Sequence, residues 1–178
     1  KWSDPGNSNN RPFIVELDAG NNRIQFMVNG GAGFISMNSY IINLNQWNFI
    51  SCVYDGVNNM MYLYHDGQLI TQNSISSVGQ LMMGSNNIHI GTHNNLYQYH
   101  DGSLDDIHIW NTVLNQNEIQ SYMNCPPLGN ETNLVGYWNF EEGSGQIVYD
   151  QTLNGHNGFN SGATYDTNIA TQSCLSLI

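Results

Sequence analysis

Residues 47–70 read WNFISCVYDGVNNMMYLYHDGQLI, and this stretch decides the fold. Apolar and polar side chains alternate along it with a period of two, which is typical of strands that bury one face. Asp66-Gly67 lies between two alternating runs, and both residues tolerate the positive φ of a two-residue hairpin turn. Asp55-Gly56 begins a longer connection. The stretch therefore predicts consecutive antiparallel strands.

The same alternation continues on both sides of this stretch, in short runs bounded by Gly, Asn or Asp. Strands are expected within RPFIVELDAG (11–20), NRIQFMVNG (22–30), NNIHIGTH (86–93), SLDDIHIW (103–110), LVGYWNF (134–140), QIVYD (146–150) and GHNGFNS (155–161). Only NTVLNQNEIQSYM (111–123) predicts a helix, with Asn111 or Thr112 as its N-cap. Short strands at this spacing indicate an all-β fold, an antiparallel two-sheet jelly-roll sandwich with one short helix.

The charge of the chain excludes several classes of partner. Lys and Arg total 3 against 14 Asp and Glu among 178 residues, which gives a formal net charge of -11. A field of this sign repels phosphate backbones and anionic membrane surfaces, so nucleic acid is not an expected partner. It attracts cations, and calcium in particular binds carboxylate and carbonyl oxygens. No apolar run approaches membrane-spanning length, so membrane insertion is not expected either.

Three cysteines bear on the setting of the protein. Cys52 lies in an alternating strand pattern and is interpreted as a small buried hydrophobe. Cys125 and Cys174 lie in polar, loop-like surroundings, and they either form one bridge or remain two thiols. Low Lys content, abundant Asn and two cysteines available for a bridge indicate a secreted, extracellular or cell-surface protein. The chain begins KWSDPGN without a Met, so we expect it to be a piece of a longer protein.

Three segments together resemble one known family. WNFISCVYDGVNNMMYLYHDGQLI resembles the central hairpin of laminin-G-like, concanavalin-A-like jelly rolls. GSLDDIHIWNTVLNQNEIQSYM (102–123) is similar to the closing signature of that family, a Gly, an acid pair, a strand and a short helix. LVGYWNFEEGSGQIVYDQTLNGHNG (134–158) is similar to the segment that usually opens such domains. The combination is specific, although each motif alone is weak.

The order of these segments differs from the usual order in the family, because the opening segment follows the closing helix. We interpret residues 1–178 as a single permuted jelly roll. Residues 1–124 supply the central and closing strands, 125–133 are a connection, and 134–178 complete the sandwich, with one or more N-terminal strands missing. The alternative is the end of one jelly roll followed by the start of another. This organisation resembles secreted and cell-surface multidomain proteins of Bacteroidetes.

The adjacent acids Asp105 and Asp106 repel each other unless something neutralises them. In domains that this chain resembles, the loop from Asp150 lies near the strand that Asp105 begins. The resemblance thus implies a calcium ion held by Asp105, Asp106 and Asp150 with the carbonyls of Asn154 and His156. The alternative is a cap in which backbone amides satisfy the carboxylates. Because strand neighbours alternate, one acid of the pair is expected to face inward and the other outward.

Catalysis is not expected. Glucanases of the superfamily that the chain resembles carry Glu-x-Asp-x-x-Glu on one strand, so that one carboxylate attacks and another protonates. Glu16 and Asp18 match this pattern, but Asn21 stands where the second Glu should be. Glu141 and Glu142 are also adjacent, and as strand neighbours they should point to opposite faces.

A glycan-binding site is expected between two strands. The segment THNNLYQYHDG (92–102) gathers aromatic, imidazole and amide side chains, and sugars bind to aromatic faces and amide groups. The candidate ligand-binding residues are His93, Asn95, Tyr97, Tyr99 and His100. The alternative is an ordinary Tyr-rich hairpin whose rings cover the sheet. His89 and His93 are four residues apart, a spacing that suits zinc on a helix, but they lie in an alternating strand pattern, so the six histidines do not predict zinc.

The sequence therefore predicts a non-catalytic, calcium-stabilised carbohydrate-binding or adhesion module on the outside of a cell, within a larger protein. Its partners would be a carbohydrate or cell-surface glycan and neighbouring domains or subunits. The alternative is a structural spacer or an assembly unit completed by strands of a neighbour. A glycoside hydrolase is a more distant alternative.

Overall fold

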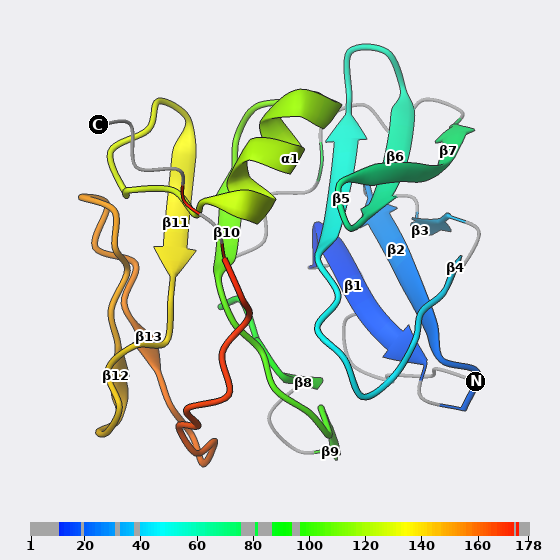
Figure 1. Ribbon diagram of the computed structural model, residues 1–178. Coiled ribbons are helices and arrows are strands. Elements are labelled where there is room, and N and C mark those ends of the chain that lie inside the picture. The colour runs from blue at the N-terminus through cyan, green and yellow to red at the C-terminus, as the bar shows by residue number, and fades with distance from the viewer. Residues whose placement is uncertain are drawn as a thin grey trace. The chain divides into compact units, whose positions relative to one another are not determined.

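The computed structural model describes residues 11–18, 20–30, 33–37, 40–75, 81, 87–93, 97–172 and 174. The chain splits into two compact units, Lys1–Ile88 with Leu114–Gln120, and His89–Val113 with Ser121–Ile178. The strand pairs of the described residues are antiparallel, and those residues contain a single short α-helix (Figure 1), so the all-β fold class is confirmed. That helix is too short to cross a membrane.

The strands of the first unit form two antiparallel sheets within its described residues. One sheet has the order β1-β2-β3, with β4 also pairing with β2, and the other has the order β5-β6-β7. The strands are β1 (Phe13–Asp18), β2 (Arg23–Asn29), β3 (Phe34–Ser36), β4 (Tyr40–Ile41), β5 (Ile50–Asp55), β6 (Met60–His65) and β7 (Gln68–Ser74). Short β3 and β4 were not predicted, since two or three residues carry too little alternation to be recognised.

One hydrophobic core joins these two sheets. Alternate residues of β2 point inward, and Phe26 and Val28 are buried. Met61 and Leu63 of β6 are completely buried in the same cluster. Because both sheets contribute to a single cluster, the first unit is a two-sheet sandwich, as the alternation predicted.

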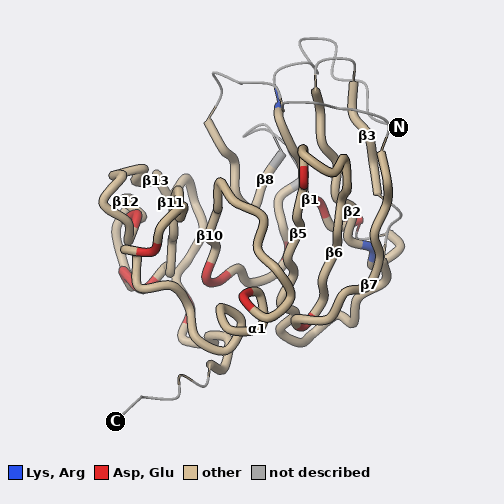
Figure 2. Tube along the Cα trace, turned by 90° about the horizontal axis from the view of Figure 1, so that it is seen from above, with Lys and Arg blue, Asp and Glu red and all other residues tan. Residues whose placement is uncertain are grey.

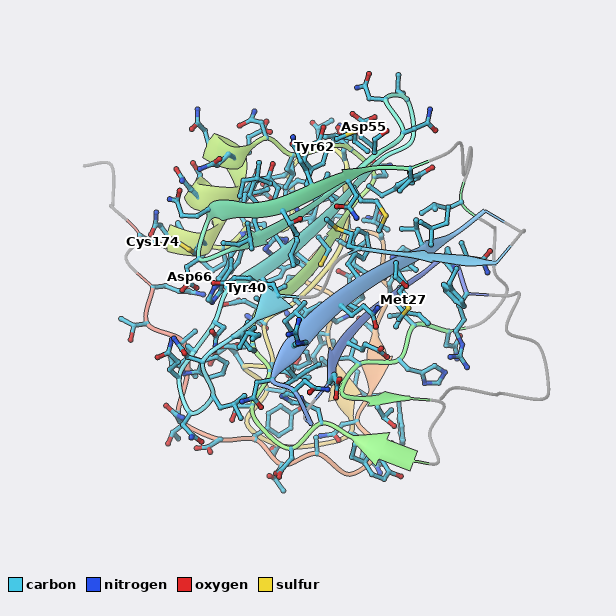
Figure 3. The ribbon with its side chains drawn as sticks, turned by 90° about the vertical axis from the view of Figure 1, so that its right-hand side faces the viewer. Met27, Tyr40, Asp55, Tyr62, Asp66 and Cys174 are labelled. Atoms are coloured by element: carbon cyan, nitrogen blue, oxygen red, sulfur yellow. A yellow bond between two sulfur atoms is a disulfide. The ribbon has the colours of Figure 1, made fainter. Side chains whose placement is uncertain are left out.

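Two acidic turns lie at opposite ends of β6 (Figure 3). Asp66 and Gly67 have φ values of 48° and 70°, which confirms the two-residue hairpin between β6 and β7. At the other end, Asp55 accepts hydrogen bonds from the side chain of Asn58 (2.7 Å) and from the amides of Asn58 and Val57 (both 3.0 Å). These bonds lower the pKa of Asp55, so its carboxylate closes the β5–β6 turn in the ionised form.

Helix α1 (Gln116–Asn124) begins later than expected. Asn115 is the cap, because its Oδ1 accepts hydrogen bonds from the amides of Asn117 (2.9 Å) and Glu118 (3.1 Å). Glu118 Oε2 in turn accepts from the Asn115 amide (2.7 Å), which completes a capping box. The predicted caps Asn111 and Thr112 are therefore wrong. Ile119, which is almost fully buried, packs against residues of β5 and β6 on the sheet face that does not face the core of the first unit.

The second unit contains three short antiparallel pairs among its described residues. They are β8 (Thr92–His93) with β9 (Tyr97–Tyr99), β10 (Ile107–Trp110) with β11 (Leu134–Trp138), and β12 (Ile147–Val148) with β13 (Gly158–Phe159). The strand expected over 86–93 is wrong for residues 87–91, which pair with no strand among those described. An alternating pattern shows that a segment can form a strand, but not that a partner is present.

The β10–β11 pair joins the two sides of the connection 125–133. A permuted jelly roll requires this pairing, because the segment after the connection must return to the closing strand. The extent of a single domain over 1–178 stays a prediction, and residues 1–10 lie outside the described part.

Replacing Asn115 by Ala should lower the free energy of unfolding by about 1 kcal/mol, because the amides of Asn117 and Glu118 lose their acceptor. Asn115→Ser keeps a capping oxygen and should retain most of that stability. Urea melts followed by circular dichroism measure both. Equal losses in the two variants would mean that the side chain does not act as a cap.

Candidate functional site

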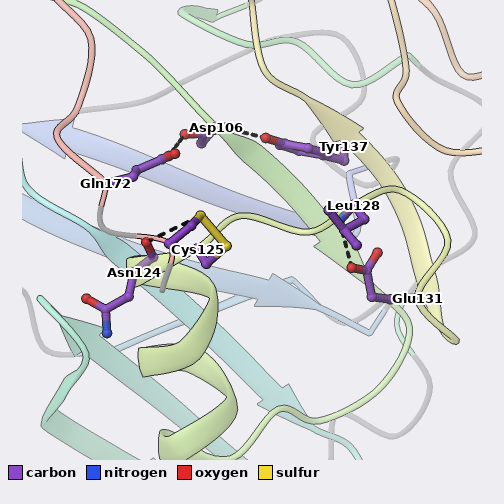
Figure 4. Close-up of a disulfide and its surroundings, with 8 residues drawn as sticks. Asp106, Asn124, Cys125, Leu128, Glu131, Tyr137 and Gln172 are labelled. Carbon is purple, nitrogen blue, oxygen red and sulfur yellow. Dashed lines mark hydrogen bonds between the residues drawn. A yellow bond between two sulfur atoms is a disulfide. The ribbon is translucent and has the colours of Figure 1, made fainter. Parts of the chain in front are cut away.

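Asp105 and Asp106 hold the C-terminal segment of the second unit. Asp105 Oδ2 accepts a hydrogen bond from the Ala170 amide (3.2 Å), and Asp106 Oδ2 accepts one from the side chain of Gln172. Asp106 Oδ1 accepts from the hydroxyl of Tyr137 at 2.5 Å (Figure 4). The two acids therefore tie the tail and strand β11 to the start of β10.

The expected alternation of these acids is wrong. Strand β10 begins only at Ile107, and Asp106 has a φ of 47°, which takes it out of the strand conformation. Both acids are half-buried and both engage the tail. Burial raises the pKa of Asp106, and the Asp105 carboxylate raises it further, while the hydrogen bonds from Tyr137 and Gln172 oppose the change.

A disulfide joins Cys125 to Cys174, with 4.7 Å between their Cα atoms (Figure 4). It ties the end of the tail to the residue that directly follows α1. Of the two states that the sequence left open, the structure thus contains the bridge. Cys52 is partly buried and packs against the core of the first unit, and burial raises the pKa of its thiol to about 12.

Asp150 is the most heavily hydrogen-bonded acid of the second unit among the described residues. Its carboxylate accepts from the amides of Tyr137 (3.1 Å), Thr152 (2.9 Å) and His156 (2.9 Å), and from the Thr152 hydroxyl (2.8 Å). Burial alone would raise the pKa of Asp150, but these hydrogen bonds outweigh it and lower the pKa. The side chain is thus an ionised cap for the loop 150–156 and for strand β11.

Of the two predicted carbonyl ligands, that of His156 accepts a hydrogen bond, whereas Asn154 takes part through its side-chain nitrogen. Asn154 Nδ2 donates to the carbonyls of Leu134 (3.2 Å) and Val135 (3.0 Å), and the His156 carbonyl accepts from Trp138 Nε1 (2.9 Å). In the described part of the chain, no three His, Cys, Asp or Glu residues form a group suited to a metal. The Asp150 carboxylate and the His156 carbonyl already accept hydrogen bonds, which does not favour a cation at these oxygens, and calcium stays a prediction.

His108 lies at the centre of an aromatic cluster in the second unit. Its Nδ1 accepts a hydrogen bond from Trp110 Nε1 (2.7 Å), and its ring lies 6.1 Å from Tyr122 and 6.3 Å from Tyr137 between centroids. Burial lowers the pKa of His108 to about 4, although the Glu131 carboxylate acts in the opposite direction. The imidazole is therefore a neutral core residue.

A shallow pocket of about 360 Å³, widely open to solvent, lies at the connection between β11 and β12. It combines carboxylates, amides, a hydroxyl and an aromatic ring. The lining residues are Asn139, Glu141, Glu142, Ser144, Tyr149 and Gln151. Sequence reasoning did not identify this pocket.

Backbone geometry explains how neighbouring acids come to line one pocket. Phe140 has a φ of 56°, an uncommon conformation for a bulky residue, and it turns the chain away from strand β11. Gly143 and Gly145 also have positive φ (67° and 96°), which completes the reversal toward β12. Glu141 and Glu142 thus lie in a turn, and the expectation that they point to opposite faces is wrong.

Hydrogen bonds fix the walls of this pocket. Glu142 Oε1 accepts from the Tyr149 amide (2.8 Å), which ties the two sides of the turn together. The Gln151 amide donates to the Tyr137 carbonyl (2.8 Å), and its side-chain Nε2 donates to the Tyr149 carbonyl (3.2 Å). The side chain of Tyr149 remains on the surface, because the residue is 55% exposed.

The predicted glycan loop is only partly within the described residues. Asn95 and the side chains of His93 and Tyr97 lie outside them. Tyr99 is 69% exposed, and His100 is half-buried and donates its amide to the Gly91 carbonyl (2.8 Å). Ligand binding by this loop stays a prediction.

The candidate catalytic strand carries Glu16 and Asp18 but ends in a turn before the position of the expected second Glu. The carboxylate of Asp18 accepts hydrogen bonds from the Gly20 amide (3.1 Å) and from Asn21 Nδ2 (2.7 Å). Burial, and then the charge of Asp18, raise the pKa of Glu16. Asn21 therefore donates to Asp18 at the position where a general acid would have to stand.

Comparison with known families was decisive for the fold. The profile of the concanavalin A-like lectin/glucanases superfamily, in its laminin-G-like form, matches residues 2–120. The chain belongs to this superfamily. The resemblance identified from the sequence is thereby confirmed.

Two solved structures are similar to this superfamily member. A candidate carbohydrate-binding protein from Bacteroides ovatus aligns with a TM-score of 0.65 and 18% identity, covering 89% of this chain and 48% of that one. The chain thus spans about half of that structure, and the likeness shows a shared fold. An S-layer domain-containing protein from Clostridium thermocellum aligns with a TM-score of 0.38 and 18% identity, covering 68% of this chain and 66% of that one. No curated protein matches the chain.

Asp150→Asn should lower the free energy of unfolding by about 3 kcal/mol, because an amide would turn one donor group toward amides that need acceptors. Asp166→Asn is the matched control, since Asp166 is exposed and accepts one hydrogen bond, from the Asn168 amide. Chemical denaturation of both variants measures the difference. Equal effects would show that the hydrogen bonds of Asp150 add nothing to stability.

His108 should make the superfamily member less stable in mild acid. Its pKa is about 4 in the folded state, against 6.5 for an ordinary histidine, so the unfolded chain binds a proton that the folded one excludes. Stability is therefore complete above about pH 6.5 and falls by on the order of 2 kcal/mol as the pH drops toward 4. His108→Gln keeps an acceptor for Trp110 and should flatten this slope in melts from pH 7 to 4. Parallel slopes would contradict the assignment.

Proposed function

We propose that this chain is a non-catalytic carbohydrate-binding module that works outside the cell as part of a larger protein. The observation that carries the proposal is the polar pocket with the exposed ring of Tyr149 at its edge. The superfamily, which includes lectins by name, and the similarity to a candidate carbohydrate-binding protein of Bacteroides ovatus support it. The second unit is then the sugar-binding part.

The lining of the pocket has the chemistry that sugar recognition needs. A pyranose ring presents an apolar face of C–H groups and a rim of hydroxyls. Tyr149 offers a flat aromatic surface for the face, and Tyr side chains combine an apolar body with a polar tip. Asn139 and Gln151 supply amides that both donate and accept, and carboxylates accept strongly from hydroxyls.

The turn that forms the pocket is held by hydrogen bonds before a ligand binds. Glu142 is fixed by the Tyr149 amide, and Gln151 is fixed through its backbone and its side chain. A site whose walls are held before the ligand arrives loses less conformational entropy on binding. These contacts let the pocket act as a small, shallow sugar site.

The geometry of this pocket suits hydrolysis less well than it suits binding. A glycosidase needs two carboxylates that flank the scissile bond, one of them with a raised pKa. Glu141 and Glu142 are successive residues of one turn, and Glu142 Oε1 already accepts a backbone amide. We therefore propose binding without hydrolysis.

The test is a glycan array, run with calcium and again with a chelator. The purified chain should bind a set of glycans, and Tyr149→Ala should weaken that binding about tenfold or more. Tyr99→Ala is the matched control, because Tyr99 is similarly exposed but belongs to the β8–β9 hairpin.

Each outcome of this array decides between named alternatives. Loss with Tyr99→Ala but not with Tyr149→Ala would move the site to the 92–102 loop. Loss with chelator would restore the calcium prediction, whereas we expect binding to persist because amides occupy the Asp150 carboxylate. No binding under either condition would overturn the proposal in favour of a structural spacer or assembly unit.

A further inference from the structure

The face of the β12–β13 ribbon next to the pocket is apolar and exposed. Ile147 is 44% exposed and Phe159 is 65% exposed, and the two are direct partners in the ladder. Paired residues of an antiparallel ribbon project from the same face, with Cβ atoms about 5 Å apart. Val148, which lies between Ile147 and Tyr149, is buried on the other face. The outer face of the ribbon therefore presents Ile147 and Phe159 to solvent.

This face is continuous with the pocket through Tyr149. Exposure alternates from residue 147 to 150, with Ile147 and Tyr149 exposed and Val148 and Asp150 buried. Tyr149 thus projects on the same side as Ile147, about 7 Å further along the chain. Tyr149 directly follows the ladder, which ends at Val148, so the residue that edges the pocket lies two positions along the chain from the Ile147–Phe159 pair.

We infer that the pocket and this ribbon face form one extended site for an uncharged glycan chain of two or more units. The inference rests on the proposed function. One sugar unit occupies the pocket against Tyr149, and the next unit lies on Phe159 and Ile147. Two aromatic surfaces in succession suit a chain of rings better than a single terminal sugar.

The negative charge of the second unit disfavours anionic glycans. The second unit contains no Lys or Arg, and its acids are Asp101, Asp105, Asp106, Glu131, Glu141, Glu142, Asp150 and Asp166. Figure 2 shows acidic positions beside β11, β12 and β13. Two of these acids, Glu141 and Glu142, line the pocket itself. A uronic, sulfated or sialylated glycan would meet like charge with no Lys or Arg of this unit to pair with it, so we restrict the inference to a glycan without anionic groups.

Calorimetry with defined oligosaccharides tests this inference. The probes are glucose, mannose, galactose and N-acetylglucosamine with their oligomers of two to six units, and oligogalacturonides as the anionic counterpart of the galactose series. The intact chain should bind one neutral series with an affinity that rises about tenfold from one unit to the short oligomers and then levels off. The oligogalacturonides should bind at least about tenfold more weakly than the matching neutral chains at low salt.

Variants separate the ribbon from the pocket. Phe159→Ala should bind the monosaccharide as the unaltered chain does and lose the gain with chain length, and Phe159→Tyr should keep it. Leu153→Ala is the control for an exposed apolar residue, because Leu153 is 99% exposed and belongs to neither strand of the ribbon.

The outcomes distinguish the inference from the function on which it rests. If Tyr149→Ala abolishes binding while Phe159→Ala leaves the dependence on chain length unchanged, the pocket stands and the extended site is overturned. Preference for oligogalacturonides would overturn the assignment to uncharged glycans. If no oligomer binds the intact chain, both the extended site and the proposed function fail.

Discussion

Buried carboxylates in this chain have to be stabilised by hydrogen-bond donors, because the sequence contains only three cationic side chains, all within its first 23 residues. An ionised carboxylate that loses water needs an opposite charge or several donors. Asp55 and Asp150 each meet this requirement with amide and side-chain donors from their own turns. The polar composition of the chain, rich in Asn, Gln, Ser and Thr, supplies such donors in place of Lys and Arg. Each of these acids consequently fixes its own loop, and the loop that Asp150 fixes contributes to the candidate site.

Tyr137 links strand β11 to two of these carboxylates. Its amide donates to Asp150, its hydroxyl donates to Asp106, and its carbonyl accepts from the Gln151 amide. Burial and then Asp106 raise the pKa of the Tyr137 hydroxyl, so it remains a donor at any physiological pH. Strand β11 is thereby attached to the C-terminal segment on one side and to the loop from residue 150 on the other. Because Asp150 is held inward, its neighbours Tyr149 and Gln151 are free to line the pocket.

The parts of the fold that the sequence predicted correctly are those set by local pattern. Alternation and the Asp66-Gly67 turn predicted the β6–β7 hairpin, since both act within a few residues. The start of the helix is also determined locally, by the capping residues Asn115 and Glu118. The cap was nevertheless predicted at Asn111 or Thr112. The pocket had no such signal. It depends on a left-handed Phe140, and that conformation is sufficiently rare for a bulky residue that no pattern indicates it. The acid pair escaped prediction for the same reason, because Asp106 leaves the strand conformation one residue before β10 begins.

The shortage of Lys and Arg side chains, which determines how the loops are held, also restricts the proposed ligand. A chain that satisfies its own acids with amides keeps its surface field negative, because those donors carry no net charge. An anionic partner is thereby disfavoured, and the proposed glycan is recognised through uncharged groups, by aromatic contact and by hydrogen bonds to hydroxyls. A neutral glycan presents only such groups. A sulfated or uronic glycan would instead need the Lys and Arg residues that the second unit does not contain.

The carboxylates in the pocket are compatible with a neutral sugar for a further reason. A hydroxyl donates to an ionised carboxylate more strongly than to a neutral acceptor. The way the loops are held and the proposed ligand class thus follow from one feature of the composition.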